Sequence, residues 1–269
     1  MSDRPQATPE VFDRRAEAWD AWQETPWGRL RYRLVAHTVD RAVRRLSGTC
    51  RVLDAGGADG ADSLRLAQRG HHVTIVDHAP ALLARARARA RAAGVDHLVR
   101  TVCAGVDEVP ELRRTGEVGF DLVLCHNVLH YLPDTPAAVA GLATAVRPGG
   151  LISVLAPNPA MDLLAIAVRR SSPAEAFGLL DAEALFSETF KHDMLRLEAE
   201  DVAAALEKSG CTVTDRFGIR CATDLIANDE LKHTPAFFAD LERLELALCD
   251  REPYLRMARF WQLLATRVK

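Results

Sequence analysis

The sequence predicts an α/β fold in which helices cover both faces of a mostly parallel sheet of seven strands. Short apolar runs alternate with segments of helical periodicity between residues 51 and 155, which is typical of a parallel sheet. Two later apolar runs, Cys211–Phe217 and Arg259–Val268, predict strands that complete the sheet. The 269 residues suit one such domain with an insertion.

Residues 1–46 are expected to form a helical flap. Met1–Glu10 is polar and without a regular pattern, and Val11–Trp22 has apolar residues at helical spacing. A break at Pro26 and Gly28 precedes a second helix that runs to Leu46. The tryptophans of this flap either pack within it or cover a cofactor and substrate.

Residues 47–156 are expected to form a cofactor-binding core. The predicted strands lie near 51–54, 72–77, 98–103, 120–125 and 150–155, and the predicted helices near 60–69, 79–93 and 135–146. The second of these helices has arginines spaced two apart, which spread around it and predict a solvated surface. They are Arg85, Arg87, Arg89 and Arg91.

Residues 157–200, here called the cap, are expected to be a substrate-facing insertion. They follow the fifth strand at the carboxyl edge of the sheet, where open α/β folds bind ligands. One helix is expected over Met161–Val168. Residues 201–269 should complete the fold, with helices over Asp201–Ser209 and Pro235–Cys249 beside the two last strands.

A glycine-rich turn follows the first strand, in RVLDAGGADG (51–60). Gly56 and Gly57 allow a sharp turn and a close approach of a ligand to the backbone. Asp54 is placed to hold either the turn or a ligand amine. The second strand ends in Asp77, where an acid binds the two ribose hydroxyls in nucleotide-binding folds. Together these residues predict a cofactor that contains a nucleoside.

These motifs resemble those of class I S-adenosylmethionine (SAM)-dependent methyltransferases. VLDAGGADG and VTIVD are similar to motifs I and II, and FDLVLCHNVLHYL (120–132) and RPGG (147–150) to later motifs. The resemblance implies a Rossmann-like fold, SAM as cofactor and S-adenosylhomocysteine (SAH) as its product. It implies an adenine contact at Gly105, Val106 and Asp107. Ala58 stands where the superfamily usually has its middle glycine.

A closer resemblance covers nearly the whole chain. GRLR (28–31), LDAGGADG, residues 120–132, GIR (218–220) and REPY (251–254) are similar to bacterial tRNA 5-carboxymethoxyuridine methyltransferases. It implies that Arg31 binds the SAM carboxylate and that His126, Gly56, Gly57 and Asp77 also contact the cofactor.

The chain departs from this family where an RNA substrate would bind. That family can carry a lysine run in the cap, where this chain has Arg169 and Arg170 followed by several acids. GIR is followed by CATDL, which offers no aromatic side chain for stacking on a base.

Methyl transfer from a sulfonium is an in-line displacement, so no fixed catalytic triad is expected. His126 ends the fourth strand at the cofactor edge, and His130 and Tyr131 follow it closely; these three residues are the catalytic candidates. His192 in the cap is a further candidate base. If the acceptor were a carboxylate, no base would be needed and Arg220 or Arg251 could hold it.

Composition sets the compartment and the class of partner. The net charge of -3 disfavours nonspecific nucleic-acid binding, and the six cysteines show no CxxC spacing, which fits a reducing cytoplasm. We expect no metal site. The start has no apolar signal core, and no run approaches the ~18 apolar residues of a membrane span. The oligomeric state does not follow from the sequence.

Several functions compete. The first is methyl transfer to an oxygen or nitrogen of a small-molecule acceptor. The second is esterification of the wobble-uridine carboxylate of tRNA, and the third is SAM binding without catalysis. An NAD-dependent dehydrogenase is disfavoured, because GGADG lacks the G-x-G-x-x-G spacing.

Overall fold

The computed structural model describes residues 16–112, 119–182, 184–187 and 192–268. The polar start, and the first part of the helix expected from Val11, lie outside these residues. The helix α2 spans Ala16–Glu24.

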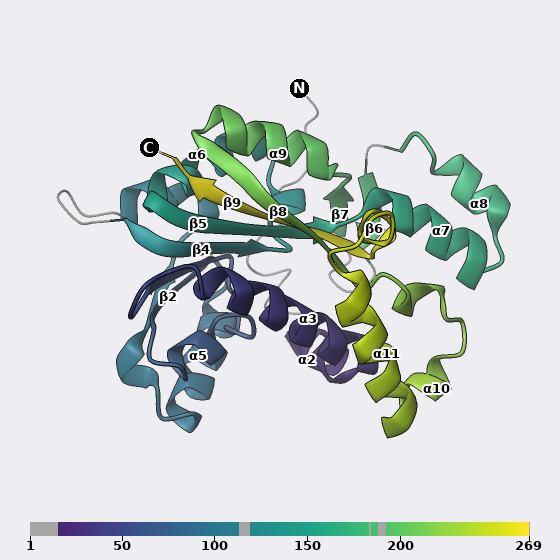
Figure 1. Cartoon of the computed structure of the whole chain (residues 1–269), viewed down its shortest axis with the longest axis horizontal. Coiled ribbons are helices and arrows are strands. Elements are labelled where there is room, and N and C mark those ends of the chain that lie inside the picture. Colours follow the sequence, from purple (N-terminus) through teal and green to yellow (C-terminus); the bar gives the residue numbers. More distant parts are fainter. Residues whose placement is uncertain (1–15, 113–118, 183, 188–191, 269) are drawn as a thin grey trace.

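A seven-stranded sheet organises the fold, in the order β3-β2-β1-β4-β5-β9-β8 (Figure 1). The first five strands are parallel, and β9 runs antiparallel to both β5 and β8. The strands are β1 Arg51–Ala55, β2 His72–Asp77, β3 Val99–Cys103, β4 Phe120–His126, β5 Val146–Pro157, β8 Cys211–Ile219 and β9 Phe260–Arg267. The predicted fold class is confirmed.

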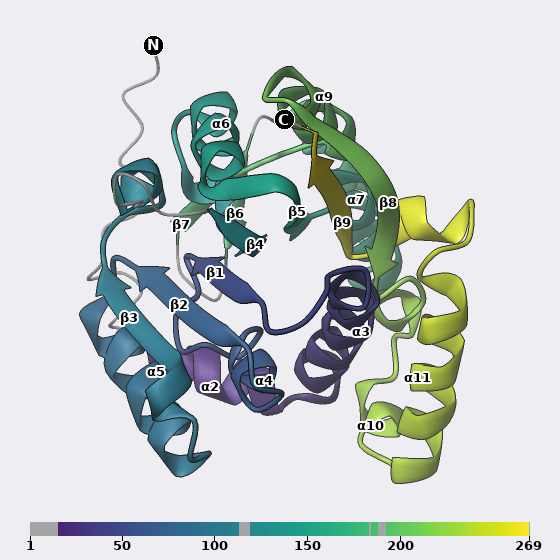
Figure 2. The same ribbon diagram turned by 60° about the vertical axis from the view of Figure 1, so that its left-hand side comes forward.

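Helices cover both faces of the sheet, as Figure 2 shows. One buried cluster joins the sheet to α3 (Pro26–Val43), α4 (Leu64–Ala67), α5 (Pro80–Ala92) and α11 (Pro235–Leu248). A second joins the opposite face to α6 (Thr135–Ala145) and α9 (Ala199–Lys208). These two apolar layers hold the sheet rigid and leave its carboxyl edge for the site.

The described part of the cap lies at that carboxyl edge and contains two helices and a small sheet. It contains α7 (Pro159–Arg169), α8 (Pro173–Gly178) and the antiparallel pair β6 (Ala184–Ser187) and β7 (His192–Leu195). Asn158 caps α7, because its side-chain oxygen accepts from the Ala160 N–H at 3.2 Å. The expected helix is present, whereas α8 and the strand pair were not predicted.

Element bounds differ from the sequence prediction in several places. The helix expected over 60–69 is only α4, because the chain after Gly60 first makes a turn at φ +77°. The second flap helix starts at Pro26, since Thr25 caps it by accepting from the Gly28 N–H at 3.0 Å. The fifth strand begins at Val146, before the turn expected there.

Two of the four arginines of α5 form ion pairs with neighbouring elements. The guanidinium of Arg89 pairs with the buried Asp59 at 2.9 Å and Arg85 pairs with Asp20 of α2. These two residues are four apart and therefore share one helix face. That face holds α2 against the glycine-rich turn. Arg87 and Arg91 are exposed, as the prediction of a solvated surface expects, while Arg85 and Arg89 are partly exposed and also form ion pairs.

None of the helices within the described ranges combines the length and hydropathy needed to cross a bilayer. Those ranges also contain no group of three His, Cys, Asp or Glu side chains arranged to hold a metal ion.

Candidate cofactor and acceptor site

A cavity of about 1090 Å³ lies at the carboxyl ends of β1, β2 and β4. Its walls include the N-terminal helices, the glycine-rich turn and α7 of the cap. All the predicted cofactor-binding and catalytic residues line it: Arg31, Asp54, Gly56, Gly57, Asp77, Gly105, Val106, Asp107, His126, His130 and Tyr131. The fold therefore brings residues that are distant in sequence to one site.

The turn after β1 requires glycine at two positions. Gly56 has φ +71°, and a Cβ there would lie 2.4 Å from the Val128 side chain. A Cβ on Gly57 would lie 2.5 Å from the Asp54 side chain. Ala58 adopts the left-handed φ of +46°, and its N–H donates to Asp77 at 2.9 Å. The Asp77 contact therefore holds the loop in place although an alanine occupies the usual glycine position.

Two buried carboxylates face the cavity from the ends of β1 and β2. Asp77 holds the turn, because its oxygens accept from the N–H groups of Ala58 and Ala79 at 2.9 and 2.8 Å. Asp54 is 2% exposed, and its Oδ2 has no hydrogen-bond partner among the residues described. Burial raises the pKa of Asp54 to about 7. A buried oxygen without a partner fits an amino group of a ligand.

Arg31, Asp62 and His126 form a buried cluster beside the turn. The Arg31 guanidinium donates to Asp62 at 2.5 Å, and the Asp62 carboxylate accepts from His126 Nδ1 at 2.9 Å. Burial opposes the charge of Asp62, but Arg31 and His126 outweigh it and lower the Asp62 pKa. The Nε of Arg31 is buried and makes no hydrogen bond within the described part of the chain. It is a donor that a ligand carboxylate could satisfy.

The imidazole of His126 is fully engaged. Its Nδ1 pairs with Asp62, and its Nε2 lies 2.8 Å from the Ser153 hydroxyl. Burial lowers the pKa of His126, so the ring is neutral at pH 7. The ring has no lone pair left for an acceptor, and this geometry does not support His126 as a base.

The adenine-contact candidates lie in the turn after β3. Val106 is buried and Asp107 is exposed, and both line the cavity with Gly105. The Gly105 N–H donates to Glu108 at 2.6 Å, so Glu108 holds this turn and leaves the Asp107 carboxylate at the cavity.

His130 and Tyr131 face the cavity from the short 3-10 helix Leu129–Tyr131. The centroids of their rings lie 4.2 Å apart. His130 is 2% exposed, and its Nδ1 has no partner in the described ranges. Burial, with a smaller contribution from the Arg259 charge, lowers the pKa of His130 to about 3. A neutral imidazole whose Nδ1 has no partner can accept a hydrogen bond from a methyl acceptor.

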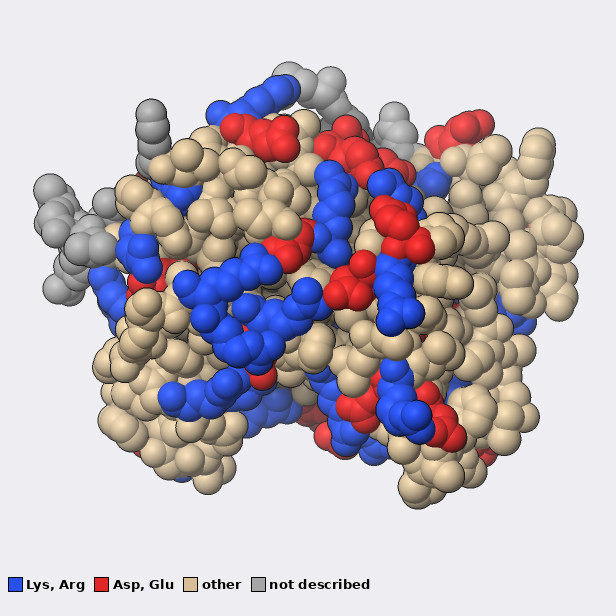
Figure 3. Space-filling model, in the orientation of Figure 1, with Lys and Arg blue, Asp and Glu red and all other residues tan. Residues whose placement is uncertain are grey.

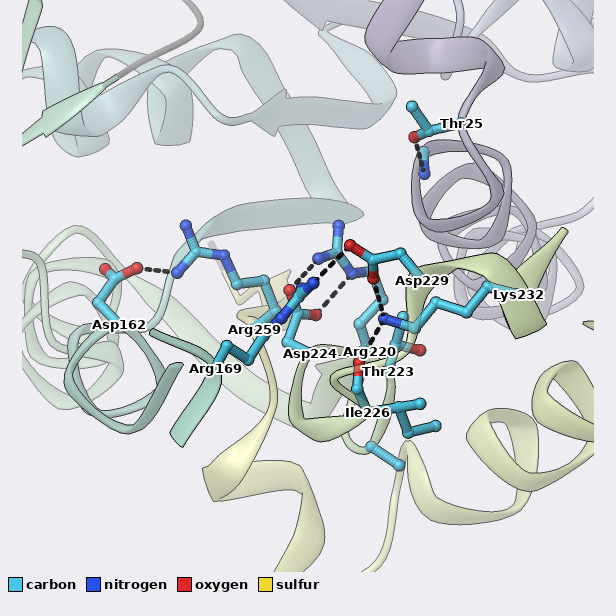
Figure 4. Close-up of polar contacts among 12 residues, drawn as sticks. Thr25, Asp162, Arg169, Arg220, Thr223, Asp224, Ile226, Asp229, Lys232 and Arg259 are labelled. Carbon is cyan, nitrogen blue, oxygen red and sulfur yellow. Dashed lines mark hydrogen bonds and ion pairs between the residues drawn. The ribbon is translucent and has the colours of Figure 1, made fainter. Parts of the chain in front are cut away.

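Ion pairs line the far side of the cavity, which we call the acceptor end (Figure 4). Arg169 donates to Asp229 at 2.6 Å, and Arg259 pairs with Asp162. The other two arginines there are also paired, Arg220 with Asp224 at 2.9 Å and Arg170 with Glu175 at 2.9 Å. Arg251 is exposed and does not line the cavity. The side chain of His192 lies outside the described part.

Sequence reasoning missed the residues that hold the site together. Asp59 and Asp62 follow the glycines directly, and their spacing after the turn was the available signal. The sequence pattern did not identify Ser153 and Gln262 as site residues, because a single polar residue in an apolar strand only interrupts the hydrophobic pattern. Glu245 of α11 gave none either, although it is fully buried.

Comparison with known proteins agrees with this architecture. Residues 52–150 match a family model described as a methyltransferase domain. The structure of magnesium protoporphyrin IX methyltransferase from Synechocystis PCC 6803, with bound SAH, covers 96% of this chain and 97% of its own, with a TM-score of 0.62 and 14% identity. The chain is a SAM-dependent methyltransferase, and its fold is the class I Rossmann-like fold.

Two curated relatives add detail. The tRNA 5-carboxymethoxyuridine methyltransferase of Escherichia coli strain K12 is 29% identical over 245 residues, which is 90% of each chain. The ubiquinone biosynthesis O-methyltransferase of Xylella fastidiosa strain 9a5c is 33% identical over 123 residues, which is 46% of this chain and 48% of the relative. The chain is thus a methyltransferase whose similarity to the tRNA enzyme extends beyond the cofactor core.

Proposed function

We propose that this enzyme transfers the SAM methyl group to an oxygen or nitrogen of a small-molecule acceptor. One observation carries the proposal. Each arginine at the acceptor end already has a carboxylate partner. Among the residues that the structure describes, ten Asp or Glu side chains and five Arg side chains line the cavity. Such a lining favours a neutral or cationic acceptor over a polyphosphate chain.

The cofactor would be held by the residues around the glycine-rich turn. In this proposal Arg31 binds the SAM carboxylate, Asp54 the amino group and Asp77 the ribose hydroxyls. The backbone of Gly56 and Gly57 lies against the ligand. The adenine contact falls to the turn after β3, at Gly105, Val106 and Asp107. Bound SAM supplies a methyl group on a positively charged sulfonium, which is a good leaving group.

The protein's part in the reaction is to orient the acceptor and to hydrogen-bond with it. The acceptor oxygen or nitrogen forms a bond to the methyl carbon as the carbon–sulfur bond breaks, and SAH leaves as a neutral thioether. When the acceptor carries a proton, His130 Nδ1 can accept a hydrogen bond from it, and the proton passes to water, because a pKa of about 3 makes the imidazole too weak a base to keep it. Tyr131 packs beside His130 and positions the acceptor.

A label-transfer experiment tests this function. The enzyme is incubated with SAM carrying a deuterated methyl group and either a low-molecular-weight cell extract or bulk tRNA, and both pools are analysed by mass spectrometry. We expect label in a small molecule. Label only in tRNA would overturn the proposal. SAH binding in calorimetry with no label in either pool would instead favour the non-catalytic reading.

The second candidate function is tRNA carboxyl methylation, favoured by the relative that matches 90% of the chain. Figure 3 shows Lys and Arg side chains gathered beside α3, with acidic side chains among them. That surface could contact a phosphate backbone. A gel shift with bulk tRNA at increasing salt tests it: steep salt dependence together with a methyl ester on a wobble uridine would establish this function, and no shift at low salt would remove it.

A further inference from the structure

A ring of buried polar side chains starts and ends on α3. Beyond Asp62 and His126, Ser153 accepts from Gln262 Nε2 at 2.9 Å, and Gln262 Oε1 lies 2.7 Å from the Thr38 hydroxyl. Arg31 and Thr38 are seven residues apart, so they lie on one face of α3. The ring crosses three adjacent strands of the sheet, β4, β5 and β9.

The hydrogen bonds of this series run in one direction when His126 is neutral. Asp62 as a carboxylate only accepts, so His126 Nδ1 carries the hydrogen and its Nε2 accepts from the Ser153 hydroxyl. Ser153 then accepts from the Gln262 amide, and Gln262 accepts from the Thr38 hydroxyl, for which the Val35 carbonyl at 3.0 Å is the more distant acceptor. The opposite amide orientation would leave two acceptors competing for the one Ser153 hydrogen. Every donation therefore points toward Asp62.

Three members of the ring lie outside the cavity. Ser153, Gln262 and Thr38 are each 0% exposed, and none of them lines it. Arg31, Asp62 and His126 do line it. Ser153, Gln262 and Thr38 thus determine the tautomer of His126. The orientation of His126 sets the position of the Asp62 carboxylate, and Asp62 in turn sets the orientation of the Arg31 guanidinium.

We propose that Ser153, Gln262 and Thr38 are positioning residues for cofactor binding, acting through His126 and Asp62 to aim Arg31 at the cofactor carboxylate. The proposal rests on the carboxylate role of Arg31 in the proposed function. It also explains why polar residues occupy three positions in otherwise apolar layers, where leucine or valine would pack without a desolvation cost.

Calorimetry with two ligands tests it: SAH, and an SAH analogue that lacks the carboxylate. Ser153→Ala leaves His126 Nε2 without a hydrogen-bond donor, so the imidazole of His126 can rotate. We expect affinity for SAH to fall roughly three- to tenfold, with less than about a twofold change for the analogue. Thr38→Val, which keeps the side-chain shape, should lower the preference for SAH in the same direction and by less.

Val154→Ala is the matched control, because Val154 is a fully buried neighbour on the opposite face of β5. It should lower the unfolding temperature and leave unchanged the ratio of the affinities for SAH and for the analogue without the carboxylate. Ser153→Ala and Thr38→Val variants that keep the full wild-type preference would overturn the positioning role. A wild-type protein that binds both ligands equally would remove Arg31 from the carboxylate, and with it this proposal. Methyl transfer is not measured, so the acceptor assignment stands or fails separately.

Discussion

The cofactor end and the acceptor end of the cavity satisfy their charged groups in different ways. Around the glycine-rich turn, Asp54 Oδ2 and Arg31 Nε are buried without a partner inside the described ranges. At the acceptor end, each arginine is paired with a neighbouring carboxylate. Because a buried polar atom without a partner costs free energy, the cofactor end is incomplete until a ligand supplies opposite charges.

This difference explains why one ligand can be inferred and the other cannot. Unpaired atoms define the groups that a ligand must bring, here an amine for Asp54 and a carboxylate for Arg31. Ion pairs that are already formed show only that the acceptor end is polar, and they do not specify which groups the acceptor carries. The acceptor must fit among ion pairs that are already formed, and His130 is the one described neutral imidazole in the cavity wall that makes no hydrogen bond at its buried Nδ1.

The largest effect should come from Glu245, which braces the acceptor end. Its carboxylate accepts from the N–H groups of Cys221, Ala222 and Thr223, at 2.5, 3.0 and 2.8 Å, and from the Thr223 hydroxyl at 2.5 Å. Glu245→Ala leaves these donors buried and unpaired, so the free energy of unfolding should fall by about 3–5 kcal/mol. Urea denaturation measures it.

Glu245→Gln is the control, because it keeps one acceptor oxygen and should lose less than the alanine variant. A loss below about 1 kcal/mol for Glu245→Ala would mean that water replaces the carboxylate and that the loop carrying Arg220 is not held by α11.

At the cofactor end, Asp77→Ala should lower the affinity for SAH by roughly 1–3 kcal/mol, since it removes hydrogen bonds to a charged group. The variant also releases the N–H groups of Ala58 and Ala79. Calorimetry measures the affinity, and Asp77→Asn separates the two roles because its amide keeps an acceptor for the turn. Unchanged affinity in Asp77→Ala would contradict the ribose assignment.

Much of the cofactor end could be read from the sequence, and little of the acceptor end. Gly56, Gly57 and Asp77 occupy fixed places relative to strand ends, so local pattern and topology together locate them. The acceptor end is assembled from α7, the segment after β8, α10 (Asp229–Lys232) and the start of β9, which no local pattern joins. His126 was predicted as a catalytic candidate from its strand-end position, but its hydrogen bonds depend on partners in β5 and the loop before α4.

The pH dependence of SAH binding should report on Asp54. Its pKa in the ligand-free protein is about 7, above the ordinary value of 3.8, so the carboxyl takes up a proton as the pH falls through 7. A bound amino group favours the ionised form. Affinity should therefore be full above pH 7 and fall by up to about tenfold per pH unit below it, with proton release on binding near neutral pH.

Calorimetry in buffers of different ionisation enthalpy measures that release. Asp54→Asn should bind SAH more weakly at pH 8 and show no proton release in this range. If wild-type affinity stayed flat from about pH 5.5 to about pH 8, a range that includes the Asp54 pKa of about 7, Asp54 would not contact the amino group.

The smallest effect should come from Ala58→Gly, which restores the usual glycine. Relief of the left-handed φ of +46° favours the variant by about 1–2 kcal/mol. The greater backbone entropy of glycine in the unfolded chain costs about 0.5–1 kcal/mol, and loss of the methyl packed against Ala79 and Leu82 costs up to about 0.8 kcal/mol. These terms nearly cancel, so the free energy of unfolding should change by less than about 0.5 kcal/mol.

Gly56→Ala is the contrasting variant. Its Cβ would lie 2.4 Å from the Val128 side chain, so this variant should be clearly destabilised. A large gain from Ala58→Gly would mean that the strain is not offset by packing, and that the turn is less well adapted to alanine than its contacts indicate.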